Sequence, residues 1–435
     1  MKSTVAVFCL ALSLFLAISP AVSAQESSPA PTVSAPAPSI APGTDPATAT
    51  RAWLDTVPAE KRAKSDAYFE GGYWLILWNF LIASAISILL LASRISARMR
   101  DFAERVTPFK TLQVMLYAIM YVLLTGLLVF PWDVYEHFFR EHAYGLATQN
   151  FAQWFREQMI GLAVGLIVGS LALAGLYAVF RRAPRTWWIW GTIAAVVFFM
   201  VGQMLAPVYI APLFNTYKPL NDPVISEAIL AMARANEIPV TQVFEVDASR
   251  QSNRVSANVA GFLGTTRIAL NDNLLKQCTL PEIREVMAHE MGHYILNHGA
   301  KLVIYFGLFF LFGFAVLRAC FDGAVRRHAN WGVRGISDPA GLPLLSLILG
   351  AVFFILTPVK NTAIRVTERE ADAFSINTAR EPEGMAKVAL KLGTYRKLDP
   401  TPMEEFIFFD HPSGRARIRM AMDWKAAHLP CGDVQ

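Results

Sequence analysis

Six long apolar blocks constrain this chain more than any other feature of its sequence. An α-helix needs about 20 mainly apolar residues to cross the hydrocarbon core of a bilayer. Only 17% of the residues are charged, against about a quarter in soluble proteins. The blocks cover residues 73–92, 111–130, 159–180, 187–206, 302–321 and 342–357. The sequence therefore predicts a mainly α, polytopic membrane helical bundle. The sixth block is short and lies between Pro343 and Pro358, so we expect a partly buried or continued helix there.

The N-terminus is typical of a secretory signal. Lys2 precedes an apolar stretch over residues 5–18, and Val22-Ser23-Ala24 is a plausible cleavage site. We interpret residues 1–24 as a signal peptide, with an uncleaved anchor as the alternative. Residues 25–64 begin with a run rich in Pro, Ala, Ser and Thr, so a disordered linker is expected.

Basic residues cluster in alternate loops between the apolar blocks. Because loops rich in Lys and Arg stay in the cytoplasm, this pattern sets an orientation. It places residues 215–300 and 359–435 outside, on the periplasmic face of a bacterial inner membrane. A net charge of +5 is modest, and we expect no nucleic-acid partner. The basic residues are Arg94, Arg98, Arg100, Arg105, Lys110, Arg181, Arg182, Arg185, Arg318, Arg326, Arg327 and Arg334.

The blocks divide the chain into segments. Four spans occupy residues 65–214, a first catalytic segment 215–300, two further spans 301–358, and a second catalytic segment 359–435. The first catalytic segment reads as a small α+β unit, with a helix over 223–236, a strand over 240–246 and a hairpin over 255–260 and 266–270. Thr279 and Glu282 form a capping box around Pro281, which predicts the start of another helix.

That helix carries the sequence HEMGH, in which His289 and His293 are four residues apart. Residues at this spacing project from one face of a helix, and two neutral imidazoles there can bind one zinc ion. Glu290 cannot ligate beside its neighbour but can reach a water on the metal as a general base. The alternative is an exposed polar helix face.

A catalytic zinc ion needs a third protein ligand and an open fourth position. Glu368 is the best candidate, and Asp372 shares its helical face. Asp372 would accept the far N–H of a zinc-bound histidine. Glu370 points elsewhere on the helix and is expected to be solvated. His298 is expected to lie off the metal face, and the histidines without partner spacing are His137, His142, His328 and His428.

The order of these motifs, HEMGH, two hydrophobic segments, ExxAD and then His411-Pro412, resembles the CAAX prenyl protease type I and HtpX-like family of membrane zinc metallopeptidases. The resemblance implies a gluzincin-like catalytic domain. It implies that His289, His293 and Glu368 bind zinc, that Glu290 is the base, and that Asp372 is either a proton donor or a partner of a ligand. It further implies that His411 and Arg417 stabilise the oxyanion and orient substrate.

One strand of the expected hairpin, near Ser256–Asn258, matches the edge strand that lies beside the zinc ion in that family. An edge strand can bind a substrate peptide by β-addition, and an ordinary hairpin is the alternative. A signal and linker stand where the family has an additional first span. The substrate and the orientation of the active site therefore stay open.

We therefore expect a zinc metalloendopeptidase with one Zn²⁺ per chain, acting on membrane-associated or misfolded proteins. The alternative is a non-catalytic zinc-binding membrane chaperone or scaffold. A transporter is disfavoured because the blocks contain few polar residues, mainly Asn79, Gln113 and Gln203. Cys278 and Cys431 could pair, although free thiols are favoured. Neither the physiological substrate nor the oligomeric state follows from the sequence.

Overall fold

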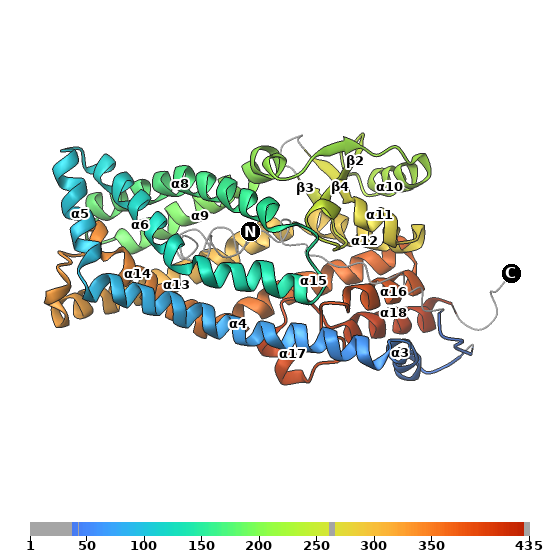
Figure 1. Ribbon diagram of the computed structural model, residues 1–435. Coiled ribbons are helices and arrows are strands. Elements are labelled where there is room, and N and C mark those ends of the chain that lie inside the picture. The colour runs from blue at the N-terminus through green and yellow to red at the C-terminus, as the bar shows by residue number, and fades with distance from the viewer. Residues whose placement is uncertain (1–36, 42, 261–265, 430–435) are drawn as a thin grey trace.

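The computed structural model describes residues 37–41, 43–260 and 266–429. The expected signal peptide and Cys431 lie outside these residues. Long helices run side by side through one half of the molecule, and the small sheet and the shorter helices gather in the other half (Figure 1). Within the described residues, five helices are long and apolar enough to cross a membrane, and a bent pair makes a sixth candidate.

The membrane helices follow the apolar blocks of the sequence. Their apolar side chains face outward as well as inward, as lipid contact requires: Leu127 is 70% exposed and Ile167 is 64% exposed. The first four spans consist of α4 (Ala59–Ala92), α6 (Lys110–Val134) with its extension η1 (Tyr135–Phe139) and α7 (Arg140–Ala143), α8 (Phe151–Arg182), and α9 (Trp187–Leu205) with η2 (Ala206–Ile210) and η3 (Ala211–Leu213). The short helix α5 (Ile95–Val106) connects α4 to α6.

The last two spans lead directly to the two helices that carry the expected metal ligands. α12 (Leu280–Ile295) is followed, after Asn297 in the left-handed conformation, by the span α13 (His298–Arg327). The short turns η5 (Ala329–Trp331) and η6 (Pro339–Gly341) then lead to α14 (Leu342–Ile355). α14 continues into α15 (Thr357–Ala379) with a bend of 59°. The expectation of a continued helix in the sixth block is thus confirmed.

A four-stranded sheet lies beside α12. Its order is β1-β2-β4-β3, so β3 is an edge strand. β3 pairs with β4 in antiparallel register, as expected of the hairpin, and Ala257 lies opposite Leu270. The elements of this segment are β1 (Tyr217–Pro219), α10 (Pro223–Ala235), β2 (Val243–Val246), η4 (Ala248–Arg250), β3 (Ala257–Ala260), β4 (Arg267–Asn271) and α11 (Asp272–Gln277).

The expectation of disorder across the whole of residues 25–64 is wrong for its second half. α3 (Pro46–Asp55) is a capped helix, and α4 begins at Ala59. Trp53 and Leu54 are buried in a cluster with α16 (Pro382–Leu392) and α18 (Gly414–His428). The Pro-rich composition hid these few apolar side chains, which are stabilised by tertiary packing. The remaining helix of this half is α17 (Pro402–Phe408).

Candidate metal centre and active site

α12 begins where its sequence predicts and presents the HEMGH motif to a cavity. The capping box of Thr279 and Glu282 is present, with Pro281 in the first turn. One face of the helix is fully buried in the core beneath the sheet, including Met287 and Met291. The opposite face carries the two motif histidines, which are partly exposed and line the cavity.

Gly292 allows α12 and α15 to pack closely. A Cβ atom at this position would lie 3.0 Å from Cδ1 of Phe374 and 3.3 Å from Cα of Ala371. Any larger residue would push the two helices apart. The close approach brings the motif histidines on α12 within reach of Glu368 on α15.

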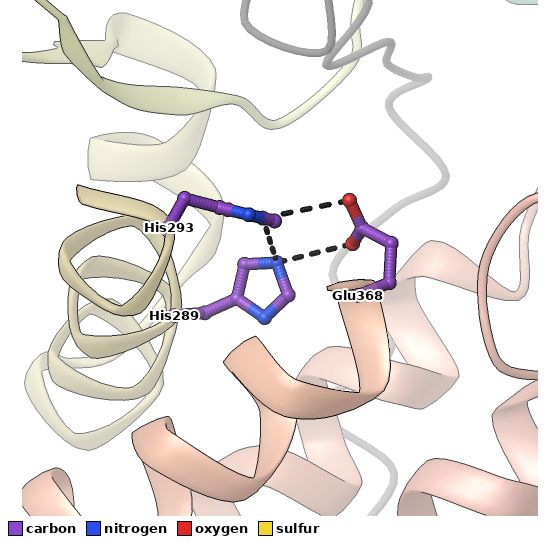
Figure 2. Close-up of side chains that lie close together, drawn as sticks. All are labelled: His289, His293 and Glu368. Atoms are coloured by element: carbon purple, nitrogen blue, oxygen red, sulfur yellow. Dashed lines mark hydrogen bonds and ion pairs between the residues drawn. The ribbon is translucent and has the colours of Figure 1, made fainter. Parts of the chain in front are cut away.

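His289, His293 and Glu368 converge on one point (Figure 2). The two Nε2 atoms lie 3.1 Å apart, Nε2 of His289 lies 3.2 Å from Oε2 of Glu368, and Nε2 of His293 lies 3.4 Å from Oε1 of Glu368. Ligand atoms bound tetrahedrally to zinc at about 2.0–2.2 Å are roughly 3.3–3.6 Å apart. The three separations lie within 0.2 Å of this range, so the two imidazoles and one carboxylate suit a zinc ion in their chemistry and need only a small adjustment in spacing.

Asp372 contacts Nδ1 of His289, the ring nitrogen that does not face the other two donors. We expected Asp372 to accept the far N–H of a zinc-bound histidine in this way. Nδ1 of His289 lies 2.9 Å from Oδ1 of Asp372, and Nε of Arg417 donates to Oδ2 at 2.8 Å. Arg417 is buried, and Nη2 also lies 3.5 Å from Oε2 of Glu368. Burial lowers the pKa of Arg417, but the two carboxylates outweigh this effect and raise it. The guanidinium thus stays charged and offsets one of the two negative charges of the buried carboxylates.

His298 is not one of the three converging donors, but it contacts His293, which the sequence analysis did not expect. It is 1% exposed, and its Nδ1 atom lies 2.8 Å from Nδ1 of His293. Its Nε2 atom lies 2.9 Å from Oε2 of Glu370, which also pairs with Lys301. Glu370 remains 42% exposed, but it is not merely solvated. Helical spacing does not predict this contact, because Asn297, at φ 52°, separates α12 from α13 and changes the direction of the chain.

His411 lies on the Glu368 side of the cluster. Its Nε2 atom is 3.3 Å from Oε2 of Glu368, and its Nδ1 atom is 2.8 Å from Oδ1 of Asp410. Aromatic contacts to α4 hold the preceding residues: the Phe408 ring stacks on Tyr73 with centroids 3.8 Å apart. Sequence analysis missed Asp410, because a carboxylate adjacent to a histidine has no diagnostic spacing.

Glu290 lies in the wall of the same cavity. Burial raises the pKa of its carboxyl to about 7, Glu368 adds to the shift, and the charges of His289 and Arg417 oppose it. A carboxyl with a pKa near neutrality can both accept and return a proton. This is the property required of a general base in hydrolysis.

The cavity has a volume of about 740 Å³ and reaches from the metal cluster to the membrane helices. Its apolar wall includes Phe199 and Met204 of α9 and Val303 of α13. Ser256 and three residues of edge strand β3, Ala257, Val259 and Ala260, form another wall. The cavity therefore joins a polar reaction centre to an apolar surface at the level of the spans.

Two family models match the chain. Residues 219–425 match peptidase family M48, and residues 47–216 match the CAAX prenyl protease N-terminal domain, which has five membrane helices. An uncharacterized metalloprotease of Bacillus subtilis, YhfN, is 30% identical over 76% of this chain and 78% of its own length. The chain belongs to peptidase family M48, and it is an integral membrane metalloprotease.

Eukaryotic relatives and a solved structure agree with this assignment. CAAX prenyl protease 1 of Saccharomyces cerevisiae is 26% identical over 69% of this chain and 70% of its own length. The crystal structure of S. mikatae Ste24p superimposes with a TM-score of 0.72 at 18% identity, covering 97% of this chain and 99% of that one. The structural likeness shows that the fold is shared along nearly the whole chain.

Proposed function

We propose that this protein is a zinc-dependent endopeptidase in which His289, His293 and Glu368 bind one zinc ion. The observation that carries the proposal is the set of three donor atoms 3.1–3.4 Å apart beside Glu290. A purely structural zinc site is usually closed by four protein ligands. Here three donors face a large cavity, which leaves room for water and substrate.

The chain's own residues would divide the work of peptide hydrolysis. Zinc, when bound, would polarise the scissile carbonyl and make a water molecule more acidic. Glu290 would accept the proton of the attacking water and pass it to the leaving amine. Since Nδ1 of His411 donates to Asp410, His411 would donate through Nε2 to the oxyanion only in the form in which both ring nitrogens carry a proton. Arg417 would offset part of the negative charge of Glu368 and Asp372. Asp372 would hold His289 in the tautomer that leaves Nε2 unprotonated.

We expect substrates to bind along β3. An extended peptide can pair with the free backbone groups of an edge strand, with its scissile bond beside the metal. The apolar wall from α9 and α13 favours membrane-associated or misfolded proteins, whose apolar segments are exposed. The named activity of the eukaryotic relatives makes a prenylated peptide one substrate to include in assays.

We place the protein in a bacterial inner membrane with its active site on the periplasmic face, because the Arg-rich loops lie at the opposite ends of the spans. Alkaline phosphatase, which is active only in the periplasm, should be active when fused after Gln435. Inactivity of this fusion, together with activity of a cytoplasmic reporter at the same point, would reverse the orientation.

Replacement of the base tests the catalytic proposal. Glu290→Gln should lose casein and peptide cleavage while it retains about one zinc ion per chain. Glu383→Gln is the matched control and should keep full activity. Glu383 lies on the surface of α16, where it pairs with Lys425. Full activity of Glu290→Gln would contradict the proposed mechanism. A wild-type protein that binds unfolded clients but cleaves none would instead support the chaperone or scaffold alternative.

A further inference from the structure

A buried histidine connects one proposed zinc ligand to a carboxylate on another helix. His298, the first residue of α13, lies with Nδ1 facing Nδ1 of His293 at 2.8 Å. Its other nitrogen, Nε2, lies 2.9 Å from Oε2 of Glu370 on α15. The three side chains therefore form a continuous chain of contacts that ends at the metal cluster.

The positions of the protons in this chain follow from chemistry. An ionised carboxylate only accepts hydrogen bonds, so the Nε2 atom of His298 carries a proton and donates it to Glu370. A neutral imidazole has one N–H, which leaves Nδ1 of His298 as an acceptor. Nδ1 of His293 must then be the donor. This arrangement leaves Nε2 of His293 with a free lone pair, directed at His289 and Glu368.

We infer that His298 and Glu370 are positioning residues that hold His293 in its metal-binding tautomer and fix the plane of its ring. This inference rests on the proposed zinc site. The opposite tautomer would put a proton on Nε2 of His293, between the other two ligands, where it would block metal binding. Lys301 pairs with Glu370 and favours the ionised carboxylate that the chain requires.

The geometry explains why a second histidine is needed. Glu370 lies two residues after Glu368 on α15, so it leaves the helix roughly 200° around the axis from that ligand. His298 fills the gap between Glu370 and His293 and is almost fully enclosed. His289 needs no such bridge, because Asp372 lies four residues after Glu368 on the same face and reaches it directly.

Zinc affinity, measured by competition with a chelator on the purified full chain in detergent, tests this role without reference to activity. His298→Ala removes the acceptor, and we expect about a 10- to 100-fold loss of affinity, as for other partners of metal-bound histidines. His298→Gln supplies a carbonyl oxygen that can accept from His293, and it should recover part of the loss. His428→Ala, an exposed histidine of α18, is the matched control and should bind as wild type.

Two further variants separate positioning from packing. Glu370→Gln keeps an acceptor for His298 and should weaken zinc binding less than Glu370→Ala. Cobalt-substituted His298→Ala should show an altered visible absorption spectrum, because the ring of His293 is no longer fixed, whereas His298→Gln should resemble wild type. A packing role alone predicts that an apolar residue of similar size, as in His298→Leu, recovers zinc affinity as well as His298→Gln does, whereas a positioning role requires the acceptor oxygen of Gln.

The outcomes also distinguish this inference from the proposed function. Wild-type affinity in a folded His298→Ala protein, or no rescue by Gln in a folded variant, would overturn the role of His298. Absence of zinc binding by the wild-type chain would overturn the proposed function itself. A loss with Ala, partial recovery with Gln and an unchanged His428→Ala control would support the inference.

Discussion

Oδ1 of Asp372 lies 2.9 Å from Nδ1 of His289, while Oδ2 of the same carboxylate accepts from Nε of Arg417. The one carboxylate thus orients His289, a proposed zinc ligand, and also pairs with the buried cation of Arg417. Asp372→Ala should lower zinc affinity about 10- to 100-fold. It should also destabilise the fold, by at most about 3–5 kcal/mol, because the buried charge of Arg417 loses its close partner and keeps only the 3.5 Å contact with Glu368.

Asp372→Asn is the conservative comparison for this prediction. Its amide oxygen can still accept from His289, so its loss of zinc affinity should be smaller than that of Asp372→Ala. Chelator competition measures the affinity, and thermal unfolding of the metal-free protein measures the stability. Equal effects of Asn and Ala on affinity would argue against an orienting hydrogen bond.

His411 should contribute to catalysis and not to metal retention. Its Nε2 atom lies 3.3 Å from Oε2 of Glu368, and the side chain lines the cavity. His411→Ala should lower kcat by about 10²–10³-fold, the usual cost of losing one oxyanion donor, with zinc content unchanged. Asp410→Asn should have a smaller effect of the same kind, because it weakens only the contact that orients the ring. Steady-state kinetics with a fluorogenic peptide and metal analysis check both, and loss of zinc in His411→Ala would contradict the assignment.

Glu285 should make the stability of the protein depend on pH. It is buried one turn before His289, and burial raises the pKa of its carboxyl from 4.5 to about 8, although a hydrogen bond from Ser375 opposes the shift. At pH values between 4.5 and about 8, Glu285 has lost its proton in the unfolded chain but keeps it in the folded chain. The free energy of unfolding therefore falls as the pH rises, by about 1.4 kcal/mol per pH unit.

Glu285→Gln should remove this contribution while it keeps an acceptor for Ser375. Melting temperatures of zinc-saturated wild type and variant, recorded from pH 5 to pH 8, should converge at the acid end and separate at the alkaline end, where the variant is more stable. Parallel curves across this range would show that Glu285 does not titrate there.

Helix α3 should be required for the stability of the C-terminal segment. Trp53 is 2% exposed and packs among residues of α16 and α18. Trp53→Ala should destabilise the protein by about 3–5 kcal/mol, the usual range for truncation of a buried aromatic side chain. Arg51→Ala is the control on the same helix: Arg51 makes an exposed ion pair with Asp399, so its loss should change stability by about 0.5 kcal/mol or less. Urea unfolding in detergent measures both, and equal effects would show that the helix is not held by its apolar face.

Local patterns were sufficient to predict the spans, the start of α12 and the shared helical face of His289 and His293. These features depend on apolar length or on a four-residue helical spacing, which act within one element. Glu368 lies on another helix, and its choice as third ligand rested on the resemblance to a known family as well as on its spacing from Asp372. The contacts of His298 depend instead on the left-handed conformation of Asn297, which breaks the helical periodicity between His293 and His298. The folding of residues 46–64 depends on packing against residues more than 300 positions away, and no local pattern encodes such contacts.

The 59° bend between α14 and α15 joins a membrane span to the helix of Glu368, and only Leu296 and Asn297 separate α12, with both motif histidines, from span α13. Spans change their tilt when the hydrocarbon thickness around them changes. A change of tilt in α13 or α14 would therefore be passed on to α12 or α15. We expect the thickness of the surrounding bilayer to influence the relative positions of the three donor atoms.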